Sequence, residues 1–391
     1  MLGWRKRAVF AVAGTLLLVG IWAASVTLKS PPRDALPSVP DTLPAQLTDA
    51  EFWTIVEDFS EPNGYFRSDN LLSNEASLQK VIPKLKERVP PGGTYIGVGP
   101  EQNFTYILNL EPKLSFIVDI RRMNMLEHLL YKALFELSTD RVDFLSRLFS
   151  RKRPNGLRES TSIETIFDAY EAVVPDNELF EHNLADTLGH LSETHKFRLS
   201  QDDEDQIRYV YNAFFRSGPN LSYTFNDSYY QGNLGMPTYR ELMLDTDGNS
   251  PARNLGFLGS EEHFRRLQAV QRKNLIVPLV GDFAGPKTLK SIGDYLKQHN
   301  AVLSVFYTSN VEMYLFQQNG RWKRFYENVG DMPTNAASTF VRFTIGRRVS
   351  FDVDQGVLTQ RSQMWSPIHE VLTAVRARRI DDYPDVIEMS K

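Results

Sequence analysis

The sequence contains no cysteine among its 391 residues. Disulfide bonds, thiol catalysis and thiolate metal ligands are therefore excluded. The chain also lacks a basic surplus: 44 lysines and arginines against 48 acidic residues give a formal net charge of −4. Proteins that bind nucleic acid generally carry such a surplus, so this class is not predicted. No serine lies in a Gly-x-Ser-x-Gly elbow, and an esterase of that type is not supported either.

One long uncharged run is present, at residues 8–28, directly after three basic residues at 5–7. As a helix, its 21 residues would span roughly 30 Å, which is enough to cross the core of a bilayer. The run predicts either an uncleaved membrane anchor, favoured by its length, or a signal peptide cut near Ser25; a buried soluble helix is the third alternative. Basic residues ahead of it predict a domain outside the cytoplasm, periplasmic or exported. The basic residues at positions 29 and 33 keep the cytoplasmic face as an alternative.

Composition predicts five segments along the chain. Residues 1–28 form the anchor or signal peptide, and residues 29–48, with five prolines, form an extended linker. Residues 49–123 carry N-terminal helices and the start of an α/β domain. Residues 124–270 form a helical insertion with a tyrosine-rich, loop-rich part at 218–260. Residues 271–391 complete the domain and end in a closing helix.

Hydrophobic spacing and capping residues predict the individual elements. Helices are expected at 47–59 after a Thr48 cap, at 77–88, 125–137, 142–149 and 288–298, from Ser200 to 214, and at 365–378, with a capping box at Thr161 and Glu164. Strands are expected at 94–98, 114–120, 275–280, 301–307 and 340–345, with a further β signal at 324–326.

The segment 94–122, TYIGVGPEQNFTYILNLEPKLSFIVDIRR, indicates the fold class. It reads as a strand, a turn at Gly97-Val98-Gly99, a helix, and a second strand that ends at Asp119. An acidic residue about 20 positions after a glycine turn is typical of nucleotide-binding βαβ units. The sequence therefore predicts an α/β fold with a Rossmann-like, mostly parallel sheet flanked by helices and a large helical insertion.

The same segment holds the predicted ligand site. Gly97 and Gly99 would let the backbone approach a ligand, and Asp119 could accept hydrogen bonds from both ribose hydroxyls of a nucleoside. The alternative is that the glycines serve only the geometry of the turn. A dinucleotide fingerprint would need a third glycine where this chain has Gln102, and a methyltransferase turn would need one where it has Glu101.

Charged residues near the turn favour one cofactor class over another. Glu101, expected in the first helical turn, would repel a pyrophosphate and attract the ammonium and sulfonium groups of S-adenosylmethionine. Arg121 and Arg122 argue for a 2′-phosphate, as in an NADP-dependent oxidoreductase, unless they are solvated residues at a helix start. The balance favours S-adenosylmethionine as the cofactor.

The order of elements resembles the class I S-adenosylmethionine-dependent methyltransferases. Gly97 and Gly99 follow the first strand, Asp119 ends the second, and Gly281-Asp282 is similar to the position whose acid contacts the adenine amino group in that family. This resemblance implies cofactor binding by Gly97, Gly99, Glu101, Asn103, Asp119, Arg121, Asp282 and Phe283. It implies acceptor binding by Tyr307, Asn310, Tyr229 and Tyr230.

Over about residues 47–346 the chain also resembles a group of uncharacterised bacterial proteins that often carry export signals. The shared segments are GVGPEQNFTYI at 97–107 and FIVDIRR at 116–122. This resemblance supplies no activity.

Other polar groups give weaker signals. His182, His190 and His195 lie close in the sequence, but the last two are five residues apart, whereas four suits a metal shared across one helical face. No metal site is therefore predicted. The polar segments 60–65 and 73–75 either cover the glycine turn as a lid or cap helices.

The expected function is methyl transfer from S-adenosylmethionine to an unknown acceptor by a membrane-tethered or exported protein. The expected partners are the membrane, through the N-terminal helix, and a small nucleoside-type ligand. S-adenosylmethionine is a cytoplasmic metabolite, so an outward-facing domain would favour the alternative of a non-catalytic binding protein. An NADP-type oxidoreductase is the lesser alternative.

Overall fold

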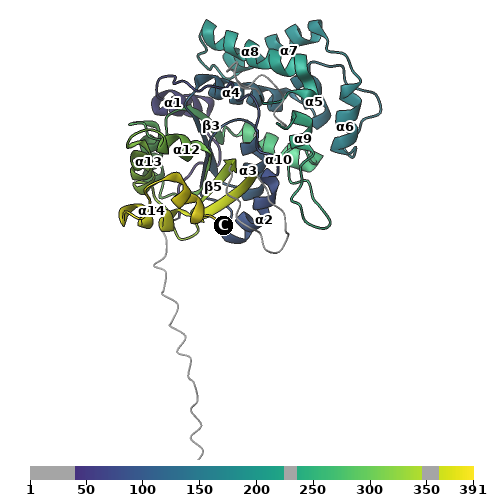
Figure 1. Ribbon diagram of the computed structural model, residues 1–391. Helices are drawn as coiled ribbons and strands as arrows, with labels where there is room; N and C mark the ends of the chain where they lie inside the picture. Colours follow the sequence, from purple (N-terminus) through teal and green to yellow (C-terminus); the bar gives the residue numbers. More distant parts are fainter. Residues whose placement is uncertain (1–39, 224–235, 346–360) are drawn as a thin grey trace, which may run out of the picture. The chain divides into compact units, whose positions relative to one another are not determined.

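A six-stranded sheet lies at the centre of the computed structural model, which describes residues 40–223, 236–345 and 361–391 (Figure 1). The strands are β1 (Thr94–Gly97), β2 (Leu114–Asp119), β3 (Ile276–Val280), β4 (Leu303–Ser309), β5 (Thr339–Ile345) and β6 (Arg361–Pro367), in the order β3-β2-β1-β4-β5-β6. All neighbouring pairs are parallel except β5 and β6, which are antiparallel. The predicted α/β fold with a mostly parallel sheet is confirmed.

Helices flank this sheet and cover its central strands. Every residue of β1, β2 and β3 is buried, as expected where helices cover both faces of a parallel sheet. The helices around the strands are α1 (Asp49–Phe59), α2 (Ile82–Arg88), α3 (Gln102–Leu110), α4 (Arg122–Leu137), α10 (Glu261–Arg272), α11 (Thr288–Gln298), α12 (Val311–Phe316), α13 (Arg321–Gly330), α14 (Ile368–Arg376) and α15 (Tyr383–Glu388). The short helix η1 (Leu78–Val81) precedes α2.

The insertion between β2 and β3 gathers on one side of the sheet, in teal in Figure 1. Its elements are α5 (Arg141–Phe149), α6 (Ile163–Glu171), α7 (Asn177–Gly189), the π-helix η2 (His190–Thr194), α8 (Gln201–Ser217), η3 (Gly218–Asn220) and α9 (Tyr239–Met243). Helix α4 joins the insertion to the sheet, because it packs against α5 and α8 as well as β2 and β3. Aromatic rings fill the junction: Phe135 stacks on Phe144 with centroids 4.6 Å apart.

Several local signals in the sequence are confirmed. Thr48 caps α1 in a capping box with Glu51, and Ser200 caps α8 in the same way. The predicted helix at 288–298 coincides with α11. The two capping boxes depend on neighbours within a few residues, so tertiary contacts do not alter them.

Three expectations are wrong. Ser162, not Thr161, caps α6 by accepting a hydrogen bond from the backbone N–H of Thr165. Residues 324–326 lie in α13 and not in a strand, because buried Phe325, Tyr326 and Val329 follow a helical spacing that a three-residue window misses. The closing helix begins at Ile368, since the residues before it pair with β5 as strand β6.

Parts of the prediction fall outside the described residues. The run at 8–28 is one, and Tyr229 and Tyr230 in the predicted loop are others. Within 218–260, the described part of the chain includes η3, α9 and a bridge between Ser222 and Thr238. Among the helices described here, none is long and apolar enough to cross a membrane.

Candidate functional site

A cavity of about 510 Å³ lies at the carboxyl ends of β1 to β4. Ligands of doubly wound sheets bind at this edge, where the strand order reverses, here between β1 and β4. The strand ends contribute Val98, Gly99, Val118, Asp119, Gly281, Asp282, Ser309 and Asn310 to the lining. The opposite wall comes from Tyr65, Phe66, Arg67, Asn70, Ser73, Asn74 and Glu75, together with residues of α12.

Asn103, which does not line the cavity, holds the turn after β1 in place through hydrogen bonds. Its amide nitrogen donates to the carbonyls of Val98, Gly99 and Pro100 at 3.0, 3.0 and 2.8 Å, and its oxygen accepts from the Tyr95 hydroxyl at 2.8 Å. A Cβ atom on Gly97 would lie 1.9 Å from that oxygen, so only glycine fits there. Gly99 has a φ of +77° and faces the cavity, whereas Gly97 and Asn103 do not line it.

Asp119 lines the cavity at the end of β2 and is bound to Arg121. Its Oδ1 accepts from the Arg121 backbone N–H at 2.9 Å and from Nε at 3.1 Å. The same guanidinium donates to the carbonyls of Ser68 and Asp69 and is buried. Arg122 forms a two-pronged ion pair with Asp203 of α8, with Nη2 2.9 Å from Oδ2. Both arginines are thus already paired with carboxylates of this chain.

Glu101 does not line the cavity. It occupies the cap position before α3, is fully buried, and accepts a hydrogen bond from the backbone N–H of Ser73 at 3.2 Å. Burial raises the pKa of Glu101 to about 7. Its carboxyl group therefore holds the segment 73–75 against the glycine turn.

Near the glycine turn, the carboxyl group that lines the cavity belongs to Glu75 and not to Glu101. It accepts hydrogen bonds from the Ser309 hydroxyl at the end of β4 and from Gln363 Nε2 of β6 at 2.5 Å. Only 1% of Glu75 is exposed, and burial raises its pKa above the ordinary value. A buried carboxyl group with a raised pKa in a cavity is a common property of functional sites.

The two polar segments before β1 have different places in the structure. Glu61 caps α11, because its Oε1 accepts from the backbone N–H groups of Lys287 and Thr288 at 2.8 and 3.0 Å. The segment 73–75 instead forms part of the cavity wall.

The far side of the cavity is built by Asp282 and Phe283 after β3. Asp282 forms an ion pair with Arg321 at the start of α13. Phe283 packs edge-on against Phe306 with centroids 4.9 Å apart, and its ring forms part of the lining. Tyr307 lies behind the wall, where its hydroxyl accepts from Gln102 Nε2 at 3.3 Å.

The structure therefore divides the predicted site residues into two groups. Those that line the cavity are Gly99, Asp119, Asp282, Phe283 and Asn310, and those that lie behind its wall are Gly97, Glu101, Asn103, Arg121 and Tyr307. Tyr229 and Tyr230 are outside the described residues.

Behind the glycine turn lies a buried polar face of α4, which the sequence does not predict. It consists of Asn124, Glu127, His128 and Tyr131, each of which is at most 2% exposed. His128 Nε2 lies 2.9 Å from the Gly99 carbonyl oxygen, and burial lowers the pKa of His128 to about 4. Burial also raises the pKa of Glu127 well above its usual range. Because the sequence spacing of α4 is dominated by leucines, it gave no reason to separate these residues from the apolar core.

A family model described as a domain of unknown function (DUF7790) matches residues 71–382. The match covers all six strands and most of the cavity lining. No curated protein matches the chain.

Proposed function

We propose that this chain, which belongs to the DUF7790 family of domains of unknown function, binds a nucleoside-type ligand in the cavity at the carboxyl ends of β1 to β4. One observation carries the proposal: Gly99, Asp119 and Asp282 lie at the carboxyl ends of three adjacent strands and line one cavity at the reversal of the strand order. This is the edge where Rossmann-like folds hold nucleotides. The volume of about 510 Å³ is within the range of small-ligand sites.

S-adenosylmethionine is the proposed ligand within that class. Asp119 would accept the ribose hydroxyls, while Asp282 and Phe283 would lie beside the adenine. Three carboxylic acids, Glu75, Asp119 and Asp282, line the cavity. Carboxyl groups suit a sulfonium and an ammonium group better than a pyrophosphate. This favours S-adenosylmethionine over a dinucleotide, and the NADP alternative loses support because carboxylates of the chain occupy Arg121 and Arg122.

Methyl transfer is the proposed reaction. It depends mainly on alignment of the acceptor with the sulfonium, and on a base only where the acceptor carries a proton. Glu75 is the proposed base, because its carboxyl group lines the cavity and burial raises its pKa. Asn310, at the end of β4, would contact the acceptor.

A second candidate is a binding protein without catalysis. Asp119 and Asp282 are each already paired with an arginine, and no histidine or lysine of the described residues lines the cavity. Proton transfer would thus depend on Glu75, the lining carboxyl group of the described residues that is not paired with an arginine, or on the lining tyrosines Tyr65, Tyr223 and Tyr314. The proposed export of the domain through the run at 8–28 favours this candidate, because S-adenosylmethionine is made in the cytoplasm.

We expect the purified full-length chain to be stabilised against heat by S-adenosylmethionine and S-adenosylhomocysteine and not by NADP. Asp119→Asn removes a carboxylate acceptor of charged hydrogen bonds, each worth about 1.5–3 kcal/mol, and should weaken binding by roughly 10- to 100-fold. Asp202→Asn, an exposed change on α8, should leave calorimetric affinity unchanged. No response to either sulfur ligand would refute the proposal, and a response to NADP alone would favour the oxidoreductase.

The affinity for S-adenosylmethionine should rise with pH through the raised pKa of Glu75. Ionised Glu75 attracts the cationic ligand, and its loss should cost about tenfold in affinity. The Glu75→Gln variant should bind at all pH values as the wild type does at low pH. Calorimetry across pH 5 to 9, with the sulfonium-free S-adenosylhomocysteine as the control ligand, measures this. An identical pH profile in the variant would remove Glu75 from the proposed site.

A further inference from the structure

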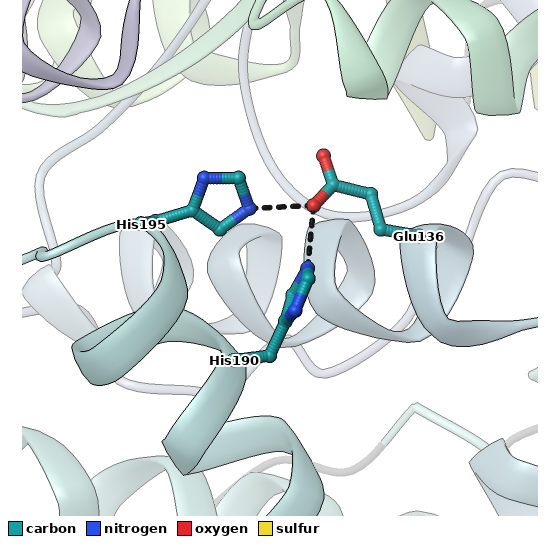
Figure 2. Close-up of side chains that lie close together, drawn as sticks. All are labelled: Glu136, His190 and His195. Atoms are coloured by element: carbon teal, nitrogen blue, oxygen red, sulfur yellow. Dashed lines mark hydrogen bonds and ion pairs between the residues drawn. The ribbon is translucent and has the colours of Figure 1, made fainter.

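Three side chains outside the cavity converge on one point. Glu136 lies near the end of α4, His190 begins the π-helix η2, and His195 follows its last residue. Figure 2 shows both imidazole rings pointing at the Glu136 carboxylate. The Nε2 atoms of His190 and His195 lie 2.7 and 2.6 Å from Glu136 Oε2, and all three potential ligand atoms are within 4.8 Å of one another.

The π-helix explains why two histidines five residues apart meet. In an α-helix the residues on one face are spaced by three or four, so a separation of five would turn the rings apart. Here the His195 backbone N–H donates to the His190 carbonyl at 3.1 Å, an i to i+5 bond that widens the turn. The rings come to rest with centroids 4.8 Å apart. Single π-turns are often found at functional sites.

The outer atoms of the cluster are held by further polar contacts. His195 Nδ1 is 2.7 Å from Asp49 Oδ1 at the start of α1. Lys132 donates to the second oxygen of Glu136 at 2.6 Å and to the carbonyl of Gln271 at 2.8 Å. A carboxylate on the far nitrogen of a ligand histidine is the usual outer contact of protein metal sites, because it fixes the ring and the proton position.

We propose that Glu136, His190 and His195 bind a divalent transition-metal ion of the Zn²⁺ type. Two imidazoles and one carboxylate are a donor set that suits zinc, and three protein ligands leave one position for water. The local charge fits, since Glu136 and Asp49 together carry two negative charges against the single positive charge of Lys132. The side chains are 18%, 11% and 7% exposed for His190, His195 and Glu136, so solvent can reach the site.

Metal binding requires the ligand atoms to rearrange. Tetrahedral ligands at about 2.0–2.1 Å from zinc stand roughly 3.3 Å apart, so Glu136 Oε2 must move away from the two Nε2 atoms, which now lie 2.7 and 2.6 Å from it. The two Nε2 atoms, which lie within 4.8 Å of one another, must reach the same separation. Both Nε2 atoms must give up the protons that they direct at Glu136. His195 releases this proton to solvent and keeps its Nδ1 proton toward Asp49, and neutral His190 carries its single proton on Nδ1 instead. The site would link α4 and η2 directly, and α1 through Asp49. It is separate from the proposed ligand cavity, whose lining includes none of these residues.

Calorimetric titration of the chelator-treated full-length chain with Zn²⁺ tests the proposal. We expect one saturable site, and Co²⁺ should give the visible absorption of a tetrahedral ion that Zn²⁺ then abolishes. His190→Ala should abolish both signals, and Asp49→Asn should weaken affinity by about 10- to 100-fold. His182→Ala is the matched control, because this histidine lies on α7 with 71% of its side chain exposed.

Each result decides the matter. Absence of saturable uptake by the wild type, with the chain folded by circular dichroism, would overturn the site in favour of a protonated His195 bridging Asp49 and Glu136. Uptake that persists in folded His190→Ala and in Glu136→Gln would also overturn it. Loss of uptake in the His182→Ala control would assign the metal to other residues.

Discussion

Replacing Arg342 by methionine should lower the free energy of unfolding by about 3–5 kcal/mol, because it leaves a buried charge without its partner. Arg342 on β5 and Glu312 on α12 are both 0% exposed and form a two-pronged pair, with Nη2 3.0 Å from Oε1. Glu312 also accepts hydrogen bonds from Tyr326 and Thr308 at 2.6 and 2.9 Å. Urea unfolding followed by circular dichroism measures the loss.

Two further variants distinguish a buried charge from a general packing defect. Arg342→Met combined with Glu312→Leu should recover much of the stability, since apolar residues can replace a buried pair at little cost. Lys84→Met breaks an ion pair whose two side chains are each 66% exposed, and should cost less than about 1 kcal/mol. A double variant as unstable as Arg342→Met would show that shape rather than charge decides the effect.

Glu101→Gln should make the protein more resistant to alkaline conditions. Burial raises the pKa of Glu101 from 4.5 in the unfolded chain to about 7 in the folded one. The folded state therefore holds the proton more tightly, and wild-type stability falls as the pH rises from about 4.5 to 7. A pKa shift of this size lowers the free energy of unfolding by roughly 3 kcal/mol once the pH has passed the folded-state pKa. Glutamine carries no such penalty and can still accept the Ser73 hydrogen bond.

The difference in unfolding free energy between Glu101→Gln and the wild type should thus grow by about 3 kcal/mol between pH 4.5 and 7.5. Urea unfolding at several pH values measures it, and the difference is insensitive to any constant cost of the substitution. Glu327→Gln, at an exposed position on α13, is the control and should show no such growth. A difference that stays constant with pH would mean that Glu101 is ionised in the folded chain at neutral pH.

Much of the sheet could be predicted from the sequence because its signals are local. The glycine turn after β1, Asp119 at the end of β2 and Asp282 after β3 each follow a short apolar run. Once a parallel sheet is inferred, the carboxyl ends of these strands must lie at one edge. The position of the cavity follows from topology alone.

The direction of side chains could not be predicted in the same way. Glu101 is at the expected position, yet its carboxyl group turns away from the cavity to the backbone of Ser73. Glu75 supplies the carboxyl group instead, through a contact with Ser309, which is 234 residues away. No periodic pattern reports a pairing over such a distance.

The histidines illustrate a different failure. In an α-helix, residues five apart point in different directions, but the single π-turn at His190–Thr194 brings His190 and His195 together. Nothing in HLSET marks a π-turn, and the two rings contact Glu136 and Asp49, which lie on other helices. Such tertiary contacts are not visible in a window of five residues.

The match to the family model begins at residue 71, yet Glu61, which precedes it, caps α11. The start of the match therefore divides residues that pack together. Helix α1 also precedes residue 71 and packs against β3 and α11, where Phe59 meets Tyr295 with ring centroids 5.9 Å apart. A chain trimmed to 71–382 would uncover the outer strand of the sheet and lose one wall of the cavity, which includes Tyr65, Phe66 and Arg67. The part of the chain that the family model matches is thus shorter than the part whose contacts stabilise the sheet.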